Sequence, residues 1–549
     1  MVRRMKTDKE KRRAKGKALS VGKLETDNDL IRPDLAKVIQ RHSFGLDENR
    51  PEAKAKRQQT QQRTARANVE DLCDPGRFVE YGALAVAAQR QRRSESDLIR
   101  KTPADGMIAG IGSVNGSLFG EEKARCMVLA YDYTVLAGTQ GYFNHKKKDR
   151  MLHLAYEQRL PLILFAEGGG GRPGDVDSAG VWAAGLDNPT FAAFARLSGH
   201  VPLVGVVSGM CFAGNAALLG CCDVIIATKN SNIGMGGPVM IEGAGLGVFQ
   251  PEEIGPIEVQ TKNGVVDIEV ADEAEAVAVA KKYLSYFQGA TAAWKAGDQL
   301  CLRNIIPEKS KRVYNVCKVI KAIADEDSFL ELKPKFGPSM VTGLLRIEGR
   351  PLGVIANNPL HMAGAIEAEG ADKAARLMQI CNVHGLPILS LCDTPGFMVG
   401  PEVEKRAHVR HVCRMFVIGS HMTVPCFTIV LRRGYGLGVM AMAKGGFHES
   451  FFTAAWPTGE FGGMGLEGFV KAGFKKEFAA IKNPQERAEL YDQLLAQMYE
   501  RGTAVNMASY CEIDAVIDPA DTRKWLIQGL NSIAARLPQD ANHFYVDPW

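Results

Sequence analysis

Short apolar runs recur along the chain, each bounded by glycine or proline and separated from the next by a longer, mixed stretch. One of them, Leu162–Phe165, is followed by Ala166-Glu167 and then by four consecutive glycines, Gly168–Gly171. Apolar runs of about four to eight residues that end at glycine are typical of buried strands. Stretches such as Lys147–Glu157 and Pro189–Leu197 fit helices instead. Strands that alternate with helices predict an α/β fold with a mostly parallel sheet.

This plan occurs twice. The segment Leu386–Pro401 repeats Leu160–Gly174, since each has Leu-Pro, an apolar strand, an acidic residue and a turn rich in glycine. Each is followed by a second apolar strand that opens with Val-Pro, at Val201 and at Val424, and runs into small residues. The copies lie about 225 residues apart, and two copies of this length are too few and too long for a solenoid. The sequence therefore predicts two homologous α/β domains in tandem.

Changes in composition divide the chain into three parts. Residues 1–50 are expected to form a basic, disordered N-terminal extension, 51–300 a first domain and 301–549 a second, with a linker over 290–315. The same reasoning predicts four individual features. These are a short helix over Pro33–His42, an exposed helix over Glu52–Leu72, an irregular insertion over Glu242–Asp272 and a long helix over Pro484–Met507.

Charge and cysteine usage exclude several classes of protein. The 549 residues carry a net charge of +5, and most of that surplus lies in residues 1–20. No basic face with interleaved aromatic residues appears in the body, which argues against nucleic acid as a partner. No run reaches the roughly 18 apolar residues of a membrane span, and Asp8 and Glu10 argue against a mitochondrial transit peptide. The twelve cysteines include no CxxC pair, so we expect no metal site and a cytoplasmic protein.

The glycine-rich strand exits are the strongest candidates for chemistry. The chain lacks a GxSxG elbow, a Walker A lysine motif and HExxH. Backbone N–H groups at two converging glycine-rich exits, helped by a helix N-terminus, form an oxyanion hole. Two such holes suit an enzyme that stabilises two developing negative oxygens, for example in an enolate formed from a thioester. The alternative is that the glycines merely permit tight turns, although four clusters at matched offsets disfavour it.

Two further features have open interpretations. The run Lys146–Lys148 suits an anionic ligand such as a nucleotide phosphate, or it forms part of a solvated face. Cys211 and Cys392 fit small core residues better than nucleophiles, which need a neighbouring histidine.

The order and spacing of several motifs resemble one family over roughly Arg63 to Arg523. The motifs are Glu167–Arg172, Phe212–Ala216, Asp393–Phe397 with Gly400, Arg433–Gly436, and Ala455–Glu460. In these respects the chain resembles the carboxyltransferase (β) subunits of biotin-dependent acyl-CoA carboxylases, the group that contains propionyl-CoA and methylcrotonyl-CoA carboxylases. Gly168 and Asn215 depart from that pattern, which has serine and glycine there.

The resemblance implies an architecture and an activity. Each half would be a crotonase-like ββα-superhelix domain, with acyl-CoA bound by the N-terminal half and carboxybiotin by the C-terminal half. The active site would lie at a dimer interface within a homohexamer built as a trimer of dimers. CO2 would pass from carboxybiotin to the α-carbon of an acyl-CoA through an enolate. The chain has no Met-Lys-Met biotinylation motif and no ATP-grasp-like phosphate loop, so the resemblance implies a biotin carboxylase and a biotin carrier on a partner subunit.

The resemblance also assigns roles to individual residues. Amides at Gly169, Gly170, Gly171, Gly214 and Asn215 would hold the thioester oxygen, and those at Gly400, Gly436 and Leu437 the ureido oxygen. Cofactor-binding candidates are Arg66, Lys147, Arg172, Asp393, Phe397, Tyr435, Trp456 and Glu460. Pro401 follows Gly400 and has no N–H, so a donor expected there must come from another residue. A decarboxylase that runs the reverse half-reaction and a non-catalytic CoA-binding scaffold are the alternative functions.

Overall fold

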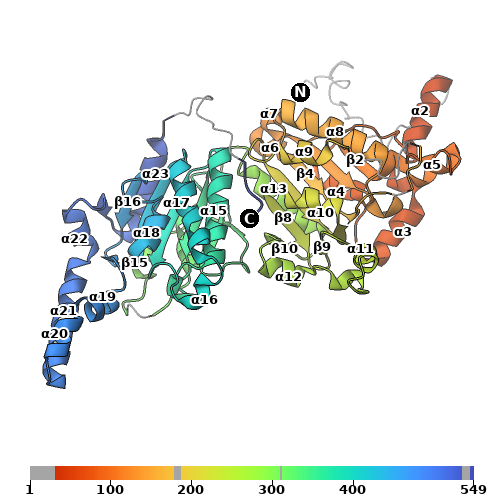
Figure 1. The fold of residues 1–549 in the computed structure, drawn as a ribbon. Helices are drawn as coiled ribbons and strands as arrows, with labels where there is room; N and C mark the ends of the chain where they lie inside the picture. Colours follow the sequence, from red (N-terminus) through yellow and green to blue (C-terminus); the bar gives the residue numbers. More distant parts are fainter. Residues whose placement is uncertain (1–30, 173, 178–186, 310–311, 535–544) are drawn as a thin grey trace, which may run out of the picture.

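The computed structural model describes residues 31–172, 174–177, 187–309, 312–534 and 545–549. Figure 1 shows two α/β halves side by side, with the N-terminal half coloured from red to green and the C-terminal half from green to blue. A helical arm that contains α19 to α22 projects from the C-terminal half.

Each half is built on one mixed sheet with the same strand plan. The first has the order β1-β2-β3-β4-β6-β8-β10, in which the β1–β2 and β2–β3 pairs are antiparallel and the remaining pairs are parallel. The second has the order β11-β12-β13-β14-β15-β16-β18, again with antiparallel pairing followed by parallel pairing. The predicted α/β class with parallel strands is confirmed.

The bounds of the first sheet are β1 (Val79–Glu80), β2 (Met107–Ser113), β3 (Arg125–Tyr131), β4 (Leu162–Phe165), β6 (Leu203–Val207), β8 (Val224–Thr228) and β10 (Ile268–Val270). Those of the second are β11 (Leu330–Leu332), β12 (Met340–Ile347), β13 (Arg350–Asn357), β14 (Ile388–Thr394), β15 (Cys426–Tyr435), β16 (Phe452–Ala455) and β18 (Ala515–Val516), with β17 (Glu460–Gly462) paired to β15. A small parallel sheet contains β5 (Gly168–Gly169), β7 (Met210–Phe212) and β9 (Asn232–Gly234).

The helices used below are α2 (Pro33–Ser43), α3 (Pro51–Gln59), α4 (Ala65–Leu72), α8 (Tyr142–Glu157), α9 (Thr190–Ala195), α10 (Gly214–Gly220), α11 (Pro238–Gly243), α12 (Ile257–Lys262), α13 (Glu273–Ser285), α14 (Val316–Ile323), α15 (Ala368–His384), α16 (Pro401–Glu404), α17 (His408–His421), α18 (Gly436–Met442), α19 (Leu466–Gly473), α20 (Lys475–Ala480), α21 (Pro484–Arg501), α22 (Ala504–Ser509) and α23 (Thr522–Asn531).

One hydrophobic cluster is shared by the two halves, and each half also has an outer cluster of its own. Alternate residues of a strand point to opposite faces of its sheet, so Met107 packs under α8 and α9 whereas Ile108 faces α13. The cluster on the α13 side continues into the facing side of the second sheet and includes α15 and α17. A third cluster covers the outer side of the second sheet, with α14 and α23. The two halves therefore repeat one sequence pattern, and their facing sides pack into one continuous hydrophobic cluster.

Three predicted elements differ from the structure. The helix expected over Glu52–Leu72 is two helices, α3 and α4, because Gln61 has a left-handed backbone and Thr64 caps α4 through its side chain. The region Glu242–Asp272 is not irregular, since it contains α12 and the core strand β10. The long helix expected to end at Met507 ends at Arg501, where Thr503 caps the separate helix α22.

The predicted helix at Pro33–His42 is confirmed as α2. Within the extension expected over 1–50, residues 31–50 lie against the body of the protein. The Gly45 carbonyl accepts a hydrogen bond from Arg66, and Arg50 forms an ion pair with Asp132. Residues 1–30 lie outside the described part of the chain.

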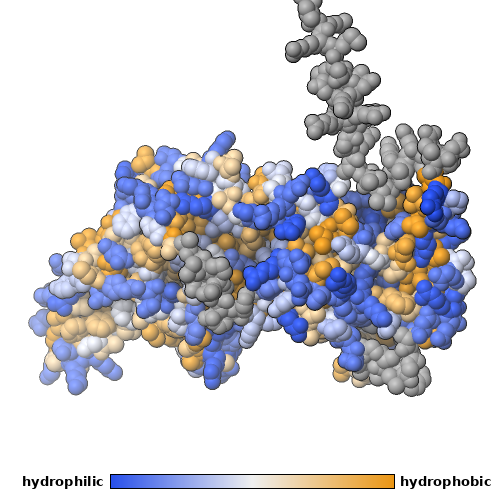
Figure 2. Space-filling view, turned by 90° about the horizontal axis from the view of Figure 1, so that it is seen from above, coloured by the Kyte–Doolittle hydropathy of each residue, from blue (hydrophilic) through white to orange (hydrophobic). Residues whose placement is uncertain are grey.

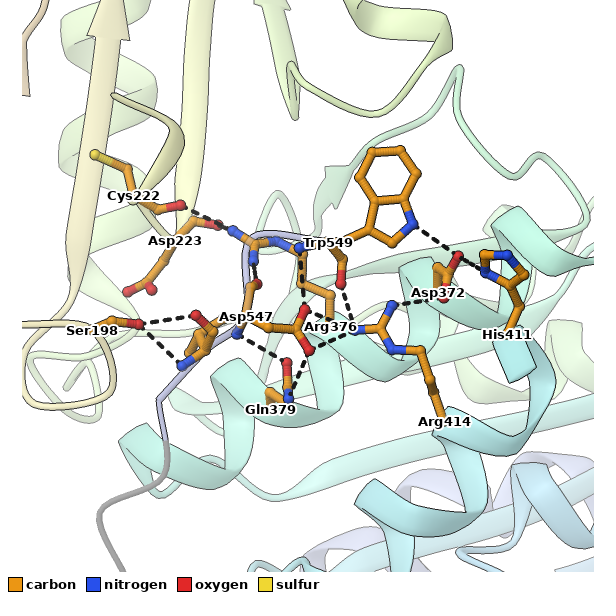
Figure 3. A network of polar contacts seen from close by, with 11 residues as sticks. Ser198, Cys222, Asp223, Asp372, Arg376, Gln379, His411, Arg414, Asp547 and Trp549 are labelled. Carbon is orange, nitrogen blue, oxygen red and sulfur yellow. Dashed lines mark hydrogen bonds and ion pairs between the residues drawn. The ribbon is translucent and has the colours of Figure 1, made fainter. Parts of the chain in front are cut away.

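The C-terminal segment lies between the two halves, where Figure 3 shows its polar contacts. Arg376 of α15 donates to the carbonyls of Cys222 and Asp223 in the first half and to that of Asp547. Ser198 of the first half exchanges hydrogen bonds with the backbone of Val546. This segment therefore adds polar contacts to the apolar core that joins the halves.

Candidate active site

The four glycines form a turn at the exit of β4. Gly168 and Gly170 have positive φ angles of 105° and 33°, which favour glycine. A Cβ built on Gly169 or on Gly171 would meet no atom within 4 Å, so these two residues border open space. A Cβ on Gly168 would collide with the backbone of Ala137 and Gly138. The turn is therefore packed tightly on one side and open on the other.

Hydrogen bonds show which amides of the turn have no protein acceptor. The Gly170 N–H donates to the Phe212 carbonyl at 3.2 Å, so it is already engaged. Gln140 brackets the turn: its N–H donates to the Gly170 carbonyl at 2.8 Å, and its carbonyl accepts from Arg172 at 3.0 Å. Among the hydrogen bonds of the described residues, none has the N–H of Gly171 as its donor.

A second amide lies next to this turn, at the start of α10. The Gly214 N–H has no acceptor within the described structure. It follows Ala213, whose φ of 52° and ψ of −124° are unusual for a residue with a side chain. A Cβ on Gly170 would lie 3.0 Å from the Ala213 Cβ, so the glycine turn and the start of α10 touch. Strained backbone of this kind concentrates at functional sites.

The C-terminal half repeats this arrangement with different residues. Ile366 brackets the turn after β14, with its N–H donating to Gly396 at 3.0 Å and its carbonyl accepting from Met398 at 2.9 Å. Phe397 therefore occupies the place that Gly171 has in the first half. The strand pairing likewise matches Gly436, with φ of 58°, to Ala213, and hence Leu437 to Gly214.

Gly400 lies outside this repeated arrangement. It caps the short helix α16 with a φ of 126°, and Pro401 is the first residue of that helix. Gly436 and Leu437 begin α18.

The acidic residue at each strand exit forms buried ion pairs. Glu167 follows β4 and binds Arg57 of α3, with 2.6 Å between Nη1 and Oε1, and both side chains are buried. Burial raises the pKa of Glu167 to about 7, although the charge of Arg57 acts in the opposite direction. Asp393, at the exit of β14, is fully buried and binds Arg432 at 2.9 Å and Arg433 at 2.8 Å. These carboxylates anchor the two turns from within the protein.

Two predicted cofactor ligands, Lys147 and Arg172, point inward. The Lys147 ammonium donates to the carbonyls of Ala104, Met107 and Gly82. Burial lowers the pKa of Lys147 to about 8. The Arg172 guanidinium, also buried, forms ion pairs with Asp105 and Asp175 and donates to Thr139.

The next lysine, Lys148, is fully buried and donates to the Tyr131 hydroxyl at 2.7 Å. Lys147 and Lys148 thus form neither a solvated face nor an open phosphate site; they lie inside the protein. Cys211 and Cys392 are buried core residues, and burial raises the pKa of both thiols, as expected for unreactive cysteines.

The aromatic candidates of the C-terminal half differ in the partners that their side chains contact. Trp456 is 1% exposed and its indole N–H donates to Thr522 at 2.9 Å, so its ring is not open to an adenine. The Tyr435 hydroxyl donates to Glu460 at 2.9 Å. Phe397 packs edge-on against His408 and Phe416.

Arg66 lines a cavity of about 1090 Å³ among α2, α3, α4 and the loop that precedes β1. Its lining includes four cationic side chains, Lys54, Arg57, Arg63 and Arg66, and five carboxylates, Asp47, Glu48, Glu70, Asp74 and Glu80. Because Arg57 and the neighbouring Gln62 both reach Glu167, the cavity adjoins the glycine turn. Arg66 is bound to the Gly45 carbonyl and to Glu80, each at 3.1 Å, which holds its side chain at the cavity wall.

Sequence reasoning missed Arg57 and Gln140. Arg57 lies in a stretch that the sequence predicts to be an exposed helix, but it is the buried residue of α3. Gln140 lies between the sequence motifs, and its only signal was the matching position in the second repeat.

Within the described residues, no group of three or more His, Cys, Asp or Glu side chains could hold a metal ion. In the same part of the chain, no helix has the length and apolar character needed to cross a bilayer.

The family model of the carboxyl transferase domain matches residues 56–542. The chain therefore belongs to the carboxyl transferase domain family.

Two curated relatives match this chain over most of their length. The methylmalonyl-CoA carboxyltransferase 12S subunit of Propionibacterium freudenreichii subsp. shermanii is 30% identical over 502 residues, covering 88% of this chain and 91% of the relative. The propionyl-CoA carboxylase beta chain of Saccharopolyspora erythraea is 28% identical, covering 91% and 93%.

Solved structures agree with this family. A single-chain, multi-domain long-chain acyl-CoA carboxylase is 57% identical with a TM-score of 0.86, covering 91% of this chain. The present chain spans only 49% of that protein. The transcarboxylase 12S crystal structure, a hexamer with methylmalonyl-CoA and methylmalonic acid bound, has a TM-score of 0.79 at 27% identity, covering 92% and 97%.

Proposed function

We propose that this chain is the carboxyltransferase component of a biotin-dependent acyl-CoA carboxylase. The observation that carries the proposal is a duplicated pair of amides, Gly171 with Gly214 and Phe397 with Leu437, for which the described part of the chain supplies no acceptor. A reaction with two developing oxyanions needs two such pairs, whereas a binding scaffold needs only one pocket. Relatives named as acyl-CoA carboxylase β subunits support the same activity.

In this proposal the Gly171 and Gly214 amides donate to the thioester oxygen of an acyl-CoA. Removal of the α-proton places negative charge on that oxygen, and preorganised donors stabilise the charge as it develops. Carboxybiotin, carried by a partner, supplies the CO2 and the base. The Phe397 and Leu437 amides face the ureido oxygen, which revises the role expected for Gly400. The donor that Pro401 cannot supply comes from Phe397 instead.

The cavity beside Glu167 is proposed to hold the CoA moiety. Its lysine and arginine side chains, Lys54, Arg63 and Arg66, suit phosphate groups. A thioester at the glycine turn and phosphates at these cations would place CoA along α3 and α4. Arg66 thus keeps its predicted role as a cofactor ligand, whereas Lys147, Arg172, Asp393 and Trp456 are proposed to support the site from inside.

We further propose that a second copy of the chain completes each site. The assembly would be a homohexamer in which each chain contributes two crotonase-like domains. Apolar side chains are exposed beside both turns: Met235 and Val239 near Phe212 are 70% and 82% exposed, and Val399 is 83% exposed. Figure 2 shows apolar residues at the surface of both halves among hydrophilic ones. Apolar groups this exposed beside a site indicate an interface.

A purification from the native host tests the proposal. The tagged chain would be isolated, blotted with streptavidin, and assayed for ATP-dependent transfer of labelled bicarbonate to acetyl-, propionyl-, methylcrotonyl- and palmitoyl-CoA. We expect a biotinylated partner and acid-stable label in at least one acyl-CoA. CoA binding without a biotinylated partner would favour the scaffold. Release of CO2 from a malonyl-type CoA, with no ATP-dependent fixation, would favour the decarboxylase.

A further inference from the structure

A chain of buried polar side chains lies beneath the amide pair of the first half. The Lys148 ammonium donates to the Tyr131 hydroxyl at 2.7 Å, and the Gln140 Nε2 donates to the same hydroxyl at 3.0 Å. Gln140 Nε2 also donates to Asn215 Oδ1 at 2.8 Å. Tyr131, Lys148 and Asn215 are almost fully buried, and Gln140 is 4% exposed. Buried networks of this kind restrict the positions of their members when their groups are satisfied.

Asn215 extends this network to the backbone of the turn. Its Nδ2 donates to the Glu167 carbonyl at 2.8 Å and to the Gly138 carbonyl at 3.0 Å. Glu167 directly precedes the four glycines, and Asn215 directly follows Gly214. One side chain therefore connects the start of the glycine turn with the start of α10.

Gln140 contacts both members of the proposed amide pair. Its backbone brackets Gly171 through the hydrogen bonds to Gly170 and Arg172. Its side chain lies directly against Gly214, because a Cβ built there would be 3.1 Å from Gln140 Oε1. A displacement of the Gln140 side chain would thus shift Gly214. The Gln140 backbone meanwhile fixes the position of Gly171.

The second half shows that the fold does not require this network. Ile366 has the backbone hydrogen bonds of Gln140 but an apolar side chain, and it is fully buried. Gly438 stands where the first half has Asn215, and it approaches the Gly396 backbone directly. The polar side chains are therefore a specific feature of the half proposed to bind the thioester.

We propose that Gln140 is a positioning residue that acts through Asn215 to fix the spacing of the Gly171 and Gly214 amides for the developing thioester oxyanion. This inference rests on the proposed carboxyltransferase function. Gln140 touches no reacting atom; its side-chain amide sets the position of the two donors. A geometric error of this kind affects the transition state more than substrate binding.

The test is the substitution Gln140→Met in the holoenzyme purified with its biotinylated partner. Methionine keeps the backbone hydrogen bonds and a similar volume but removes both side-chain donations. We expect kcat to fall by about tenfold or more, in line with the cost of small misplacements, while KM for the acyl-CoA changes by less than about twofold.

Gln288→Met is the matched control. Gln288 is likewise buried and makes three side-chain hydrogen bonds, to Val114, Lys123 and Asn115, at the opposite end of β3 from Tyr131. We expect it to lower the melting temperature at least as much as Gln140→Met while leaving kcat near wild type. Equal kcat losses in the two variants would overturn the proposal, because they would show a purely structural effect.

A double variant tests whether Gln140 acts through Asn215. If it does, Gln140→Met combined with Asn215→Ala loses no more activity than the more impaired single variant. Multiplicative losses would overturn this step. The result stays separable from the proposed function, since an inactive Gly171→Val variant with an unaffected Gln140→Met variant would refute only the positioning role.

Discussion

The Arg57 guanidinium donates to the Glu167 carboxylate with 2.6 Å between Nη1 and Oε1, and so ties helix α3 to the exit of β4. This contact joins the wall of the proposed CoA cavity to the glycine turn. Arg57 also lies 3.9 Å from Glu273 of α13, and the same Glu273 accepts from the Arg63 N–H. Helix α3 and the segment that follows it are therefore bound to the elements that form the proposed site.

Glu167→Gln should change how stability depends on pH. Burial raises the folded-state pKa of Glu167 from 4.5 to about 7, so the folded state holds this proton when the unfolded state has lost it. Stability from this group is then present below pH 4.5 and is lost as pH rises toward 7. The loss amounts to about 3 kcal/mol at most. We expect the free energy of unfolding of wild type, measured by urea unfolding, to fall relative to that of Glu167→Gln from pH 5 to pH 7.5.

Glu258→Gln provides the control for this pH dependence. Glu258 forms an exposed pair with Lys262, where solvent screens the charges. The free energy of unfolding of Glu258→Gln should differ from that of wild type by a constant amount over the same pH range. A constant difference for Glu167→Gln as well would contradict the pH effect assigned to burial.

Gly171→Val should abolish carboxyl transfer without unfolding the protein. Its side chain would enter open space beside the proposed oxyanion site. Gly170→Val is a poorer probe, because a φ of 33° and the Ala213 contact would strain the backbone as well. We expect kcat/KM to fall by about a hundredfold or more, the scale of a lost oxyanion donor. Gly297→Val, at another open glycine, should retain full activity and melting temperature; unchanged turnover in Gly171→Val would remove the amide assignment.

Asp393→Asn should destabilise the second half strongly. Its carboxylate is shared by Arg432 and Arg433 inside the protein, and loss of a buried ionic partner costs about 3–5 kcal/mol. Asp518→Asn, which removes an ion pair with the largely exposed Arg303, should unfold at the wild-type temperature. Calorimetry measures both, and equal melting temperatures would show that Asp393 is not a structural anchor.

Asp547→Ala should loosen the junction between the halves. Asp547 binds Arg414 at 2.7 Å, and its backbone N–H donates to Gln379. We expect faster hydrogen exchange in α15 and at Cys222 and Asp223, with little change in α14, which lies in the separate outer core. Asp34→Ala, in an exposed pair with Arg32, should leave exchange at the junction unchanged. Unchanged hydrogen exchange at the junction in Asp547→Ala would show that the apolar core alone holds the two halves together.

Much of the architecture follows from local sequence. Apolar runs that end at glycine identified β4 and β14, because buried parallel strands need continuous apolar residues and sharp turns at their ends. The repeated Leu-Pro and Val-Pro signatures predicted an internal duplication, and the two sheets have the same strand plan. Element breaks were harder to predict: the left-handed Gln61 and the Thr503 cap end helices that periodicity alone would continue.

By itself, the sequence determined the α/β class, the duplication and the glycine turns, since each depends on residues close together in the chain. Only the tertiary structure decided which candidate groups are buried and which border open space. Lys147, Arg172 and Trp456 turn inward, and their N–H groups find partners on distant segments. Within the described residues, the Gly170 N–H has an acceptor and the Gly171 N–H has none, because Phe212, 42 residues further along the chain than Gly170, supplies its carbonyl to Gly170. Long-range hydrogen bonding, which no local pattern records, selects the proposed site from its candidates.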